Sequence, residues 1–137
     1  MPKRRYRIII DTNLWISFLL SKNTRGLDQV FADSSLILLF SKELLDEFIE
    51  VTGRPKLKKY FNKVDLQNLL VQIDLRAEFI NVSSNVELCR DPKDNFLISL
   101  ALDGNANFLL TGDNDLLVLK KVGKTQIITI TQFLELF

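Results

Sequence analysis

The sequence contains no histidine and a single cysteine, Cys89, among its 137 residues. Without histidine the chain cannot build a Ser-His-Asp triad, a histidine general base or a histidine-containing zinc site. One cysteine cannot form an internal disulfide, so we expect Cys89 to be a small buried or half-buried residue. Any chemistry must therefore come from carboxylates, lysines and hydroxyls, which favours a mechanism based on acids and a metal ion.

The sequence also lacks long apolar runs and an excess of either charge. No apolar run approaches the ~20 residues of a membrane span, and the basic start is followed by a segment with two polar residues, Asp11 and Asn13, and no small-residue cleavage site. We therefore expect a cytoplasmic protein without a membrane segment. Its 18 basic and 17 acidic residues give a net charge of +1, so no global field attracts a polyanion. The length and the 47% hydrophobic content predict one globular domain, residues 1–137.

Apolar runs suited to buried strands alternate with patterns typical of helices. The predicted strands are residues 6–10, 36–40, 78–82, 107–111 and 126–130. Helical periodicity occurs in residues 27–31, 44–51, 66–73 and 97–101, and residues 52–63 are predicted to be a turn with a short helix. Parallel strands need crossover connections, which are usually helical, so the alternation predicts an α/β fold with a mostly parallel sheet and helices on both faces.

Acidic residues follow two of the predicted strands. Asp11 comes directly after the apolar run YRIII, with no turn residue between them. Such a residue either points into the crevice at the carboxyl edge of the sheet or caps the next helix. The fourth strand runs into Thr111, and two further acids, Asp113 and Asp115, follow it.

Two predicted helices carry acids near their first turns. Ser41 is a plausible N-cap for a helix that starts at Lys42, and Glu47 lies about 40° from Val51, at the edge of the apolar stripe. Glu47 can be a half-buried site residue or an ordinary boundary glutamate.

In the stretch RDPKDNFL, Asp91 is predicted as an N-cap, Pro92 as the first helical residue and Asp94 as the third. Capping explains Asp91 well. It explains Asp94 less well, because Asp94 shares a helix face with Leu97 and Ile98.

Four carboxylates, Asp11, Glu47, Asp94 and Asp113, are therefore expected to converge at one edge of the sheet. Converging acids repel one another and raise each other's pKa values unless a cation is present. Oxygen ligands without histidine or thiolate select Mg²⁺ or Mn²⁺, so a metal-binding crevice would resolve the repulsion.

The segments IIIDTN, SKELLDEF, DPKDNFLISLAL and LLTGDNDLL, in this order and spacing, resemble the PIN domain family over essentially the whole chain. The resemblance is closest to stand-alone prokaryotic PIN proteins described as toxins of toxin-antitoxin pairs. It implies a three-layer α/β/α sandwich and a Mg²⁺- or Mn²⁺-dependent endoribonuclease. It also implies a cognate antitoxin partner and, as is common in the family, a homodimer.

Carried over by position, the resemblance makes Asp11, Glu47, Asp94 and Asp113 the catalytic, metal-binding acids. Asp115 is a substitute for the fourth. It assigns substrate-binding roles to Asn13, two residues past the first acid, and to Thr111, the hydroxyl before the last acids.

An acidic crevice alone would repel RNA, so basic residues must bind the flanking phosphates. We expect this of the cluster Arg54, Lys56, Lys58, Lys59 and Lys63, and secondly of the basic residues between positions 3 and 7. Each basic cluster can also be a solvated surface. Apolar residues expected at a dimer interface, if they are not core, are Trp15, Phe18, Phe133, Leu134 and Phe137.

Two other functions stay open. A phosphatase of the haloacid dehalogenase type also starts with an apolar strand ending in Asp, but usually has a second Asp where this chain has Asn13, which cannot donate a carboxylic proton. A PIN-like fold that has lost catalysis and only binds RNA or protein is the other alternative, against which the complete set of acids argues.

Overall fold

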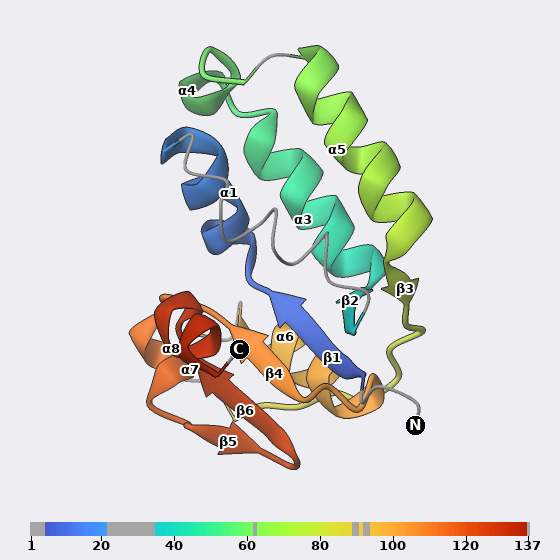
Figure 1. The fold of residues 1–137 in the computed structure, drawn as a ribbon, viewed down its shortest axis with the longest axis vertical. Helices are drawn as coiled ribbons and strands as arrows, with labels where there is room; N and C mark the ends of the chain where they lie inside the picture. Colours follow the sequence, from blue (N-terminus) through green and yellow to red (C-terminus); the bar gives the residue numbers. More distant parts are fainter. Residues whose placement is uncertain (1–4, 22–34, 62, 89–90, 92–93, 137) are drawn as a thin grey trace.

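The computed structural model describes residues 5–21, 35–61, 63–88, 91 and 94–136 (Figure 1). Several sequence predictions fall outside these residues: the helix at 27–31, Cys89, the Pro92 position, Phe137, and Lys3 and Arg4 of the N-terminal basic cluster. Among the described helices, none is both long and apolar enough to cross a membrane.

The described strands form one six-stranded sheet in the order β3-β2-β1-β4-β6-β5. Their bounds are β1 Tyr6–Ile10, β2 Leu36–Phe40, β3 Glu78–Phe79, β4 Phe108–Leu110, β5 Lys121–Val122 and β6 Thr125–Ile128. Strands β3, β2, β1, β4 and β6 pair in parallel, and only the described edge strand β5 is antiparallel. The mostly parallel sheet predicted from the sequence is confirmed.

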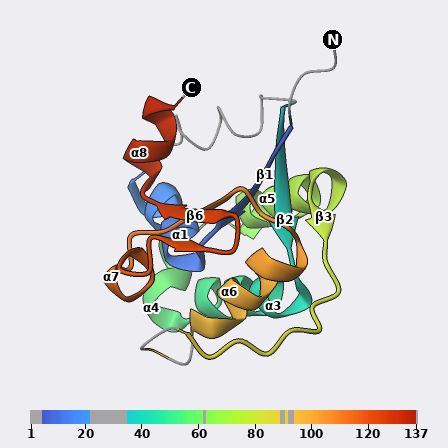
Figure 2. The ribbon, with the colours of Figure 1, turned by 90° about the horizontal axis from the view of Figure 1, so that it is seen from below.

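The described helices are α1 Thr12–Ser21, α3 Lys42–Thr52, α4 Pro55–Lys58, α5 Lys63–Arg76, α6 Asn95–Asp103, α7 Asn114–Leu117 and α8 Ile130–Glu135. In Figure 1, α6 lies behind the sheet and α8 in front of it, and Figure 2 shows these two helices on opposite sides of β6. Helices α1, α3, α4 and α5 gather beyond the end of the sheet toward which β1 points (Figure 1). The predicted α/β sandwich is thus confirmed.

The central strand β1 is covered on both faces. Its residues Ile8, Ile9 and Ile10 are 0%, 0% and 1% exposed, although successive side chains of a strand point to opposite faces. A strand with one solvated face would alternate apolar with polar residues, so this continuous apolar run reflects helices packed on each side. Of the apolar residues left open between the core and a dimer interface, Trp15, Phe18 and Phe133 are buried in the core, whereas Leu134 is exposed.

Some predicted boundaries are wrong for identifiable reasons. The last strand ends at Ile128 rather than at residue 130, because Thr129 caps α8 in a reciprocal capping box with Gln132. The third strand is only Glu78–Phe79: the Ile80 backbone N–H still donates to the Phe40 carbonyl oxygen at 2.8 Å, and the chain then leaves the sheet. Helices α1, α7 and α8 and strand β5 are absent from the sequence-based prediction.

The predicted start of one helix is confirmed, and a glycine ends another. Ser41 caps α3, with its side chain accepting a hydrogen bond from the backbone N–H of Leu44 at 3.2 Å. Gly104 ends α6, where a Cβ would lie 2.9 Å from the Leu100 carbonyl oxygen and 2.9 Å from the Leu39 side chain. No other residue type fits there without a shift of its neighbours.

Candidate metal and catalytic site

The site begins where β1 and β4 end side by side. Ile10 is the register partner of Leu110, so Asp11 and Thr111 follow at the same edge of the sheet. The Asp11 backbone N–H still donates to the Leu110 carbonyl oxygen at 3.0 Å, which extends the pairing by one residue. Parallel pairing alone therefore places a carboxylate and a hydroxyl next to each other.

Asp11 is both a helix-terminal residue and a site residue. One carboxylate oxygen accepts from the backbone N–H of Asn13 in the first turn of α1, at 3.3 Å, and the other accepts from the Thr111 hydroxyl at 2.7 Å. The side chain is only 4% exposed. Burial raises the pKa of the Asp11 carboxyl above its usual value, the two hydrogen bonds lower it, and the nearby charge of Asp113 raises it further.

Thr111 joins Asp11 to Asp113. Its hydroxyl donates to Asp11 and accepts from the backbone N–H of Asp113 at 3.0 Å. Asp113 in turn caps the short helix α7 by accepting from the backbone N–H of Asp115 at 2.9 Å. Asp113 therefore faces the other acids, whereas Asp115, the suggested substitute, is not among the charges that act on Asp11 or Asp94.

Asp94 is the N-cap residue of α6, which corrects its predicted place as the third helical residue. The helix starts at Asn95, and Asp94 instead closes a turn in which its backbone N–H donates to the Asp91 carbonyl oxygen at 3.0 Å. Its side chain makes no capping hydrogen bond.

The Asp94 side chain interacts with the other acids. Burial, a hydrogen bond with Asp113 and the charges of Asp113, Asp11 and Asp91 raise the pKa of Asp94 from 3.8 to about 7. Two carboxyl groups form a hydrogen bond only if one of them is protonated, so the Asp94–Asp113 pair holds a proton near neutral pH. Three of the four predicted acids thus act on one another.

Glu47 lies to one side of this cluster. It is half-buried on α3 and accepts a hydrogen bond from the Thr12 hydroxyl at 2.7 Å. Thr12 follows Asp11 directly and is 2% exposed, so α1 connects Glu47 to the cluster through a buried hydroxyl. In their present positions, the acids of the described part of the chain include no group of three that could hold one metal ion.

A cavity of about 300 Å³ opens beside the acids. It is lined by Asn13, Leu14, Ser17, Gly112 and Asp113, so Asn13 and one of the acids share the same opening. Ser17, Gly112 and Thr12 were not singled out from the sequence. Thr12 had one available signal, since it stands next to the first acid of the IIIDTN motif.

The basic residues predicted to bind RNA are exposed around α4. Lys56 and Lys58 lie in α4 itself, and Lys59 follows it with its ammonium 5.1 Å from the centroid of the Tyr60 ring. Arg54 differs, because its guanidinium makes two hydrogen bonds to Glu50, at 3.0 and 2.9 Å. A phosphate would have to compete with Glu50 for Arg54. Among the described residues, Lys56, Lys58 and Lys59 make no ion pair with an acid, so a phosphate would meet no such competition there.

The structure is an α/β domain with aspartates at the carboxyl edge of a parallel sheet. Comparison with known protein families shows to which family such a domain belongs here. The model of the PIN domain family matches residues 7–115 of this chain. An uncharacterized protein of Methanocaldococcus jannaschii is 32% identical over 128 residues, which cover 90% of this chain and 81% of that protein. The chain belongs to the PIN domain family, whose members are generally nucleases that use divalent metals.

Proposed function

We propose that this chain is a Mg²⁺- or Mn²⁺-dependent endoribonuclease that hydrolyses phosphodiester bonds in RNA. The main support is the proximity of Asp11, Asp94 and Asp113, which come from three separate elements: the charge of Asp113 raises the pKa of Asp11, and the charges of Asp113 and Asp11 raise the pKa of Asp94. Isolated structural acids rarely need such an arrangement, whereas hard cations are bound by it.

The donor set fits a hard divalent cation, since all its side-chain ligands are carboxylates. We propose Asp11, Asp94 and Asp113 as the principal ligands, with Glu47 and Asp115 as the outer acids. The three ligands would have to move closer together around the ion, because in their present positions no three acids of the described residues could hold it. A cation bound there would lower the pKa of a bound water and neutralise charge on the phosphoryl oxygens.

The remaining chemistry comes from the chain's own side chains. The carboxylate of Glu47 or Asp94 would orient the attacking water or accept its proton, as a general base does. The Thr111 hydroxyl orients the Asp11 carboxylate, and the Thr12 hydroxyl orients Glu47. Asn13, at the cavity that includes Asp113, is positioned to contact the substrate.

The test is incubation of pure protein with end-labelled mixed RNA in EDTA, Mg²⁺ or Mn²⁺. We expect internal cleavage only with metal, and a loss of at least about a hundredfold in Asp113→Asn. The matched control is Asp74→Asn, which removes an exposed acid of α5 and should cleave like the wild type. RNA that is bound but never cut would favour the binding module, and full activity of Asp113→Asn would place the reaction elsewhere.

A cognate antitoxin and a homodimer stay predictions. Because Trp15, Phe18 and Phe133 belong to the core, a dimer would have to use other residues. Light scattering of the pure protein measures the oligomeric state directly.

A further inference from the structure

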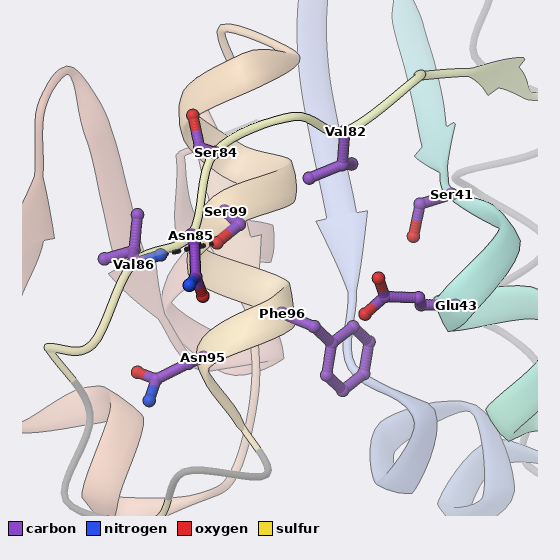
Figure 3. A pocket seen from close by; sticks show the side chains of 9 residues that line it. All are labelled: Ser41, Glu43, Val82, Ser84, Asn85, Val86, Asn95, Phe96 and Ser99. Atoms are coloured by element: carbon purple, nitrogen blue, oxygen red, sulfur yellow. Dashed lines mark hydrogen bonds between the residues drawn. The ribbon is translucent and has the colours of Figure 1, made fainter.

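A second cavity, of about 220 Å³, lies between the start of α3, the first turns of α6 and the extended segment 82–86 (Figure 3). It is smaller than the roughly 300 to 1,000 Å³ of sites for drug-sized ligands, so it suits one planar ring system. Its lining residues are Ser41, Glu43, Val82, Ser84, Asn85, Val86, Asn95, Phe96 and Ser99.

Hydrogen bonds fix the outer wall of this cavity. The backbone N–H groups of Ser83 and Ser84 donate to one carboxylate oxygen of Asp103 at 2.6 and 2.8 Å, and the Ser84 hydroxyl donates to the other oxygen. Farther along, the backbone N–H of Val86 donates to the Ser99 hydroxyl at 3.1 Å. The extended segment is thus tied to the middle and to the C-terminal end of α6, which gives the cavity a preformed shape.

The lining has two apolar walls and two polar edges. In Figure 3, Val82 lies above the cavity and Phe96 below it, whereas Glu43 and Asn85 project from opposite sides. Phe96 is the aromatic residue of the lining, and stacking on an aromatic side chain is a common way to hold an unpaired base.

The polar side chains of Glu43 and Asn85 are available to bond a ligand. Within the described part of the chain, neither the Glu43 carboxylate nor the Asn85 amide makes a hydrogen bond or an ion pair. The described lining residues include no lysine or arginine, so the cavity does not suit a phosphate. A carboxylate only accepts hydrogen bonds, whereas an amide both donates and accepts.

The cavity adjoins the acidic site. Glu43 lies one helical turn before Glu47 on α3, and Phe96 lies two residues after Asp94. A nucleotide whose phosphate reached the acids could therefore place a neighbouring base in this cavity.

We propose that this cavity binds a guanine base of the RNA substrate next to the scissile phosphate; the proposal rests on the ribonuclease function. Guanine presents two adjacent donors, N1–H and N2–H₂, which match the two oxygens of Glu43. On the same Watson–Crick edge, adenine, cytosine and uracil have an acceptor next to each donor, so they do not offer two adjacent donors to the Glu43 carboxylate. The Asn85 amide can donate to the O6 or N7 acceptor of the same base.

The experiment measures base preference without cleavage. Fluorescein-labelled hexamers with a single G, C or U in an oligo(A) background, together with oligo(A) itself, are titrated with protein in EDTA and followed by anisotropy. We expect wild type to bind the G hexamer roughly fivefold or more tightly than the others, the lower end of a bidentate base contact. Glu43→Gln should lose this preference and Asn85→Ala should weaken it. Asp46→Asn, an exposed acid on the same helix, should keep it.

The outcomes separate this proposal from the ribonuclease function. No preference for guanine in wild type, or an unchanged preference in a folded Glu43→Gln protein, overturns the guanine site even if RNA is cleaved. A guanine preference that Glu43→Gln abolishes supports the site even if no cleavage is ever seen. Thermal melting confirms that each variant folds.

Discussion

Replacing Asp94 by Asn tests the acidic site most directly. In the folded protein the ionised form of Asp94 is opposed by burial and by three neighbouring acids, which raise its pKa from 3.8 to about 7. A shift of about three units corresponds to about 4 kcal/mol at 1.36 kcal/mol per unit, as a ceiling. Because the side chain is half-buried, solvent screening reduces this to about 1–2 kcal/mol.

The raised pKa of Asp94 determines whether stability rises or falls with pH. Between about pH 4 and pH 7 the folded state holds a proton that the unfolded state has lost, so wild-type stability falls as pH rises through this window. Asn does not ionise. We therefore expect Asp94→Asn to be more stable than wild type by about 1–2 kcal/mol at pH 8, with the difference shrinking toward pH 4.

The assay is urea unfolding followed by circular dichroism in EDTA from pH 4.5 to 8.5, with RNA cleavage in Mn²⁺ measured on the same preparation. Cleavage should fall by orders of magnitude while stability at pH 8 rises. Asp74→Asn controls for the loss of one exposed charge. A destabilised but fully active Asp94→Asn protein would refute the reasoning, because it would make Asp94 a structural residue only.

Three further variants test the rest of the site. Asp11→Asn should greatly weaken Mn²⁺ binding in calorimetry, and equal binding by the two proteins would sink this ligand assignment. Thr111→Val removes a hydrogen bond to a buried carboxylate and should lower the free energy of unfolding by roughly 1–3 kcal/mol, so unchanged stability would contradict its role. Replacing Lys56, Lys58 and Lys59 by Ala should reduce the log-log salt slope of RNA binding by roughly 0.7 per lost contact, and an unchanged slope would place the RNA elsewhere.

The sheet was predictable because β2 is apolar throughout and β1 is apolar apart from Arg7, which pairs with Glu78. The bounds of β1 and β2 match the prediction at both ends, since a strand buried on both faces leaves a continuous apolar run. Burial on several sides also explains why α1 was not predicted. Trp15, Ile16 and Phe18 are all buried, so the sequence shows no clear amphipathic stripe. The start of α8 was readable, because Thr129 and Gln132 have the spacing of a capping box.

The proximity of Asp11, Thr111 and Asp113 was predictable for a different reason. Parallel strands end at a common edge, so residues that follow adjacent strands meet there whatever their side chains are. The hydrogen bond from Thr12 to Glu47 was not predictable, because it depends on how α1 packs against α3. Sequence periodicity gives the buried face of each helix but not the neighbour that this face meets.

Asp94 shows why residue type alone cannot separate capping from site chemistry. An acid at a helix N-terminus is favoured by the helix dipole by about 0.3–1 kcal/mol, which lowers its pKa by less than about one unit. The pKa of Asp94 is instead raised to about 7, so burial and the acids Asp113, Asp11 and Asp91 outweigh the dipole several-fold. A residue kept only as a cap would not be placed against three other acids. Burial and repulsion together therefore outweigh what capping contributes at Asp94, which favours a role in the acidic site.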